Sequence, residues 1–82
     1  MNKELAKRLK KITPAEGGVD VSFNLQNSGQ PGKVASTLIL KVFEKTEKGM
    51  IISASITIPA VAETVAQANT SALEDALTLL GV

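Results

Sequence analysis

Residues 33–58, KVASTLILKVFEKTEKGMIISASITI, decide the fold because they contain two strand patterns separated by a tight turn. A strand places successive side chains on opposite faces, so a half-buried strand alternates between core and solvent with a period of two. The first strand, residues 33–45, has one face of Leu38, Leu40 and Val42 and another of Ile39, Lys41, Phe43 and Lys45. This alternation predicts that residues 33–45 form a strand.

Residues 46–49, TEKG, form the turn, with Gly49 at the position that needs a positive φ. The strand that follows, residues 50–58, is expected to bury one face and expose the other. Its expected inner face is Met50, Ile52, Ala54, Ile56 and Ile58, and its expected outer face is Ile51, Ser53, Ser55 and Thr57. Such a short connection favours an antiparallel pair.

Upstream, residues 19–26 alternate in the same way, with Val19, Val21, Phe23 and Leu25 on one face. The loop 27–32, NSGQPG, joins this strand to the next. We expect residues 2–12 to form an amphipathic helix with an apolar stripe of Leu5, Leu9 and Ile12, and with Asn2 as its N-cap. Thr13-Pro14 ends that helix, because a residue before proline avoids the α region.

Downstream, we expect one long helix from Pro59 to Leu80, with Gly81 just after its end. Ser71 and Glu74 have the spacing of a capping box, so a restart after Thr70 is the alternative. The continuous apolar stripe favours a single helix. The sequence therefore predicts one α+β domain over residues 1–82. It is a three-stranded antiparallel meander with an N-terminal helix and a long C-terminal helix, in the order α-β-β-β-α.

Composition excludes several chemistries. The 82 residues include no Cys and no His, so thiolate metal sites and histidine-based catalysis are impossible within the chain. We expect no enzyme activity, no cofactor and no metal. No apolar run is long enough to span a bilayer, and we expect a cytoplasmic protein. Only two Phe and no Trp or Tyr are available for a small core, which favours stabilisation by self-association.

Charge is unevenly distributed, because residues 1–48 hold all nine Lys and Arg whereas residues 49–82 hold only three acids. Phosphate binding requires little more than a row of positive charge, so the basic residues are candidate nucleic-acid contacts. These candidates are Lys7, Arg8, Lys10, Lys11, Lys41 and Lys45. An ordinary solvated helix face is the alternative for the first four. A second candidate surface, an interface with another subunit or protein partner, consists of Ile39, Phe43 and Ile51.

The closing helix carries the pattern A-x-T-x-A-L-x-x-A-L-x-x-L-G, formed by Ala68, Thr70, Ala72, Leu73, Ala76, Leu77, Leu80 and Gly81. With the preceding meander, this pattern resembles the core of the Rad52-like single-strand annealing proteins, which include phage recombination proteins. The resemblance implies a homo-oligomeric, single-stranded DNA-binding protein of phage or mobile-element type. The alternative function is a self-associating interaction or regulatory module without nucleic-acid binding.

Overall fold

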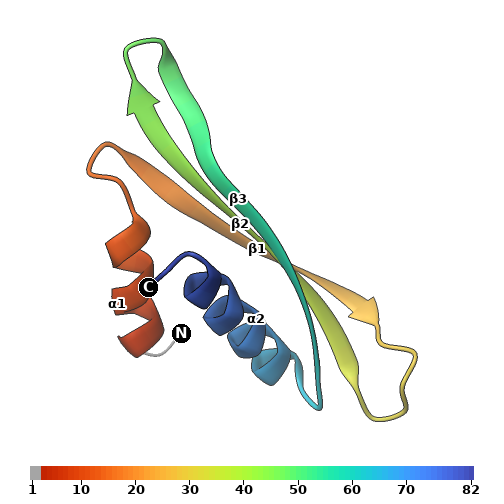
Figure 1. The fold of residues 1–82 in the computed structure, drawn as a ribbon. Helices are drawn as coiled ribbons and strands as arrows, with labels where there is room; N and C mark the ends of the chain where they lie inside the picture. The colour runs from red at the N-terminus through yellow and green to blue at the C-terminus, as the bar shows by residue number, and fades with distance from the viewer. Residues whose placement is uncertain (1–2) are drawn as a thin grey trace.

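The computed structural model describes residues 3–82 and has the predicted order of elements (Figure 1). Its elements are α1 (Lys3–Ile12), β1 (Gly17–Asn27), β2 (Val34–Thr46), β3 (Gly49–Ala62) and α2 (Val65–Leu79). The α+β prediction with an α-β-β-β-α order is confirmed. The predicted N-cap, Asn2, lies outside the described residues.

The three strands form an antiparallel sheet in the order β1-β2-β3. The β2–β3 turn consists of Glu47 and Lys48, and Gly49 has the predicted positive φ, +116°. The Thr46 hydroxyl closes this turn by donating to the Gly49 carbonyl oxygen at 2.9 Å and accepting from the Lys48 N–H at 3.2 Å. These local bonds fix the register of the hairpin.

Both helices lie on the same side of the sheet (Figure 1). α2 packs on β2 and β3, and α1 packs beside α2. Ala68, Ala72 and Ala76 are fully buried and recur every four residues, so the helix backbone lies close to the sheet. The remaining buried core consists of Leu5, Leu38, Leu40, Val42, Leu73 and Leu77.

The second helix begins later than predicted, because Pro59 lies inside β3 and the helix starts at Val65. Thr64 is its N-cap, with its hydroxyl accepting from the Gln67 N–H at 3.1 Å. The helix is 15 residues long and continues through Ser71, so the prediction of one helix without a restart is correct but its predicted length is wrong.

Pro59 is compatible with β3 because of how the backbone bonds alternate. The Lys45 N–H donates to the Glu16 carbonyl oxygen at 2.8 Å, so odd-numbered residues of β2 direct their backbone groups to β1. Pro59 is opposite Thr37, one of these odd residues. The nitrogen of Pro59 therefore faces the free edge of β3, where a missing N–H removes no bond of the sheet.

A β-bulge reverses the predicted faces at the beginning of β3. Val42 pairs with Ala54 and the next residue, Phe43, pairs with Ile52, which leaves Ser53 as an extra residue. The Ser53 hydroxyl donates to the Val42 carbonyl oxygen at 3.3 Å. Directly paired residues share a face. Ile52, and likewise Met50 opposite Lys45, therefore lie on the outer face, whereas Ile51 lies opposite Glu44 on the inner one.

The sheet is much longer than the helix that covers it. Strands of 11–14 residues span about 36–46 Å, whereas the 15 residues of α2 span about 22 Å. The β2–β3 turn and the β1–β2 loop project beyond opposite ends of the helical layer (Figure 1). Apolar side chains of the inner face near the ends of the strands, such as Leu25 and Ile51, consequently remain exposed.

Candidate nucleic-acid interface

The solvent face of α1 carries a row of lysines. Leu5, Leu9 and Ile12 belong to the core side of this helix. At 100° per residue, the opposite side is occupied by Lys3, Lys7, Lys10 and Lys11, all of which are exposed. Within residues 3–82 the single salt bridge joins Lys33 to Glu63 at 3.8 Å, so none of these four lysines is engaged in an ion pair there. This set is called the lysine face below.

Arg8 is the member of the basic segment that the structure turns inward. Its Nε donates to the Val82 carbonyl oxygen at 2.9 Å, and its Nη2 donates to the Thr78 hydroxyl at 3.1 Å. A cation at the end of a helix satisfies carbonyl groups that lack a partner and opposes the negative end of the dipole. Arg8 therefore joins α1 to the end of α2, and Val82 lies beside α1 (Figure 1).

Lys41 and Lys45, the other predicted phosphate contacts, lie on the outer face of the sheet, away from both helices. Lys41 is directly opposite Asp20, and the backbone of Lys45 is bonded to that of Glu16. Each of these lysines thus has an acidic residue as its cross-strand neighbour. The structure does not bring them together with the lysine face, and the acids reduce the positive potential around them.

The predicted interface is also divided between two faces. Ile39 and Phe43 both lie on the outer face, where Gly18 stands opposite Phe43 and leaves its ring uncovered on the β1 side. The bulge places Ile51 on the other face, and Ile52 and Met50 take its place beside Phe43. The sequence could not indicate this, because three successive apolar residues, Met50 to Ile52, fit either phase of the alternation.

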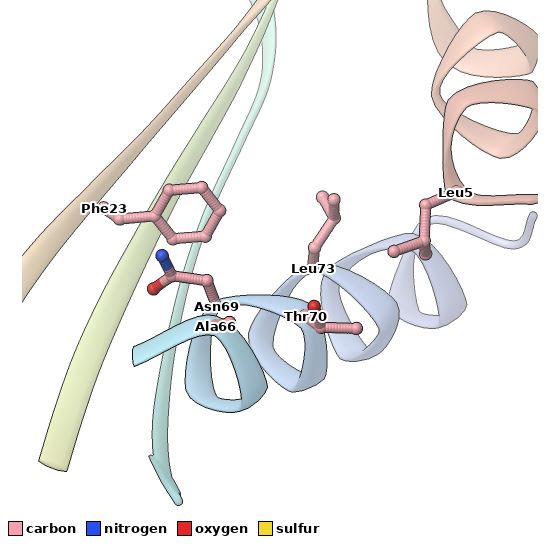
Figure 2. Close-up of a pocket in the computed structure, with 6 residues that line it drawn as sticks. All are labelled: Leu5, Phe23, Ala66, Asn69, Thr70 and Leu73. Carbon is pink, nitrogen blue, oxygen red and sulfur yellow. The ribbon is translucent and has the colours of Figure 1, made fainter. Parts of the chain in front are cut away.

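A groove that the sequence did not indicate lies between α1, α2 and β1. It has a volume of about 300 Å³ and is lined by Leu5, Phe23, Ala66, Asn69, Thr70 and Leu73 (Figure 2). Figure 2 shows the Asn69 amide beside the Phe23 ring. The amide oxygen of Asn69 accepts a 2.6 Å hydrogen bond from the buried Ser36 hydroxyl, which fixes its orientation. No lining residue is titratable, so the groove has no group for acid–base chemistry.

Comparisons of the chain with protein-family models, curated proteins and solved structures found no match. The similarity to annealing proteins therefore stays a prediction that rests on residues 68–82 and the order of elements. Neither helix of the described chain has the length and apolar content needed to cross a membrane.

Proposed function

We propose that the protein binds single-stranded nucleic acid through the lysine face of α1 and acts as a homo-oligomer of the single-strand-annealing type. The observation that carries this proposal is the grouping of four exposed, unpaired lysines on one side of a ten-residue helix. The Arg8 contacts support it, because they hold α1 in a defined position against α2. Ammonium groups on a fixed helix suit a phosphate backbone and read no base sequence.

Salt dependence gives the expected magnitude. Each phosphate neutralised on a single strand contributes about −0.7 to the slope of log K against log salt. Four lysines therefore predict a slope of about −2.8, which corresponds to about a 50-fold loss of affinity between 50 and 200 mM salt. Lys41 and Lys45 are not included in this estimate. Both lie on the outer face of the sheet, away from α1, and each has an acidic residue as its cross-strand neighbour.

The test is fluorescence anisotropy of a labelled oligothymidylate, titrated with protein at several salt concentrations. In one variant the lysine face is changed to glutamine, Lys3, Lys7, Lys10 and Lys11 together. The matched control changes four lysines elsewhere to glutamine, namely Lys33, Lys41, Lys45 and Lys48. Both variants have the same net charge, and glutamine has nearly the helix propensity of lysine.

We expect the lysine-face variant to lose binding and the control variant to retain it with a slope near −2.8. Equal losses in the two variants would contradict the proposal, since net charge rather than α1 would then be responsible. Unchanged binding by the lysine-face variant would contradict it as well. Far-UV circular dichroism of each variant shows whether α1 is still folded.

The second candidate function is a self-associating interaction module with no nucleic-acid role. The outer-face patch of Phe43, Met50 and Ile52 favours it, because Met50 and Ile52 are both more than half exposed beside the partly buried Phe43. A wild-type protein that self-associates but gives no anisotropy change at 50 mM salt would replace the first proposal with this one. Ile52→Asp would then be expected to weaken the association.

A further inference from the structure

The free edge of β1 has unpaired backbone groups at defined residues. Because the Lys45 N–H bonds to the Glu16 carbonyl, even-numbered residues of β1 direct their backbone groups to β2. The odd-numbered residues therefore direct theirs away from the sheet. From the middle of the strand onward these are Val21, Phe23, Leu25 and Asn27.

The same odd-numbered residues place their side chains on the inner face, opposite core residues of β2. α2 lies on β2 and β3, and only Val19 and Val21 of β1 pack against the core, so the inner face is incompletely covered after Val21. Phe23 is 40% exposed and Leu25 is 59% exposed. This part of β1 thus combines free backbone groups with an uncovered apolar strip, next to the groove of Figure 2.

The two edges of the sheet differ in how they are protected. β3 has Pro59, which removes an N–H from its free edge, and a bulge at Ser53. Proline and bulges are both features that prevent strand addition. Residues 21–27, VSFNLQN, contain no proline, no glycine and no charged residue, and their pairing with β2 is regular. An uncharged, alternating and unprotected edge is a site for pairing with another strand.

We propose that β1 pairs antiparallel with β1 of a second copy of this chain, which joins two three-stranded sheets into one of six strands. This inference specifies the surface of the homo-oligomer in the proposed function, and it does not depend on nucleic-acid binding. The two-fold axis passes between Asn24 and Asn24 of the second copy. Phe23 is then opposite Leu25 of the second copy, and Val21 is opposite Asn27.

This register satisfies three conditions at once. Each directly bonded pair joins two odd-numbered residues, as the free backbone groups require. On the inner face, the exposed Phe23 of each copy is covered by the exposed Leu25 of the other copy. Leu25 of the second copy then lies at the mouth of the groove. On the outer face Asn24 meets its own copy and Ser22 meets Gln26, so no like charges are brought together.

The first experiment is multi-angle light scattering of the wild type and two lysine variants from 10 µM to 1 mM. Leu25→Lys adds a charge at the proposed edge, where the side chain is 59% exposed in the single chain. Leu79→Lys is the matched control, because this leucine is 67% exposed on α2, away from β1. We expect wild type and control to have about twice the 8.6 kDa chain mass and the Leu25 variant to have the single-chain mass.

Hydrogen exchange by NMR then identifies the surface. In the wild-type dimer the amides of Val21, Phe23 and Leu25 should exchange slowly, and in Leu25→Lys those of Val21 and Phe23 should exchange at least tenfold faster. A monomeric wild type at 1 mM would overturn the proposal, as would a dimer in which these amides exchange rapidly. Dimerisation retained by Leu25→Lys but lost in Ile52→Asp would also overturn it. A wild-type protein that dimerises through β1 without binding oligonucleotide would refute only the proposed function.

Discussion

Replacing Gly17 with alanine should destabilise the protein, whereas the same change at its neighbour Gly18 should not. β1 begins so close to β2 that a Cβ on Gly17 would collide with the carbonyl oxygen of Phe43 and lie 2.9 Å from its carbonyl carbon. These are backbone atoms, which cannot turn aside as a flexible side chain can. A Cβ on Gly18 would have no heavy atom within 4 Å.

The magnitude follows from these contacts. Overpacking against a fixed neighbour costs about 1–3 kcal/mol. A Gly→Ala change also restricts the unfolded chain, which stabilises the protein by about 0.4–1 kcal/mol where the native backbone allows it. Gly17→Ala should therefore lose about 2 kcal/mol relative to Gly18→Ala. For a domain of this size that difference corresponds to about 8–16 °C in Tm.

Thermal unfolding followed by far-UV circular dichroism, with urea unfolding beside it, measures this difference. Both variants must be compared at one protein concentration, because the proposed self-association would make Tm depend on concentration. Equal stability of the two variants would refute the reasoning, since it would mean that β1 does not approach β2 as closely as Gly17 requires. A less stable Gly18→Ala would refute it more strongly.

Two further pairs of substitutions test the roles assigned to residues of α1 and α2. Arg8→Gln should lower the free energy of unfolding by about 1–2 kcal/mol, because its two hydrogen bonds to the end of α2 are lost, and should leave the salt slope of oligonucleotide binding unchanged. Lys7→Gln should do the opposite: it should make the salt slope less steep by about 0.7 and leave urea unfolding unchanged. A loss of stability in Lys7→Gln with a changed slope in Arg8→Gln would contradict the binding role of Lys7 and the structural role of Arg8. Leu77→Ala should cost about 3 kcal/mol in urea unfolding, because this side chain is fully buried, whereas Leu79→Ala should cost less than about 0.5 kcal/mol. Similar losses of unfolding free energy in the two variants would contradict the conclusion that α2 packs on the sheet through the side that carries Leu77.

The strands and α1 could be predicted from sequence because their apolar residues recur with one clear period. Val19 to Leu25 fits only a strand, and Leu5, Leu9 and Ile12 fit only a helix. The start of α2 could not be predicted in this way. A proline is compatible both with the beginning of a helix and with the edge of a sheet, and for Pro59 only the pairing with Thr37 decides between them.

The candidate site was less predictable than the fold, because it depends on which elements come together. The helical period places Arg8 nearer the core side of α1 than Lys7, but nothing in the sequence indicates that the fold brings Val82 to Arg8. Similarly, the uncovered part of β1 results from the position of α2 over the other two strands. Such relations are tertiary, so residue type and spacing alone do not indicate them.

The extra residue of the bulge, Ser53, is a position in β3 at which the chain can be shortened by one residue. Ser53 lies between two pairs whose β2 members, Val42 and Phe43, are consecutive. Its removal would join Ile52 directly to Ala54, and both would keep their present partners and faces. Elsewhere in the strand, a one-residue deletion moves every later side chain to the other face. β3 therefore contains one position at which a codon can be lost without changing which side chains reach the core.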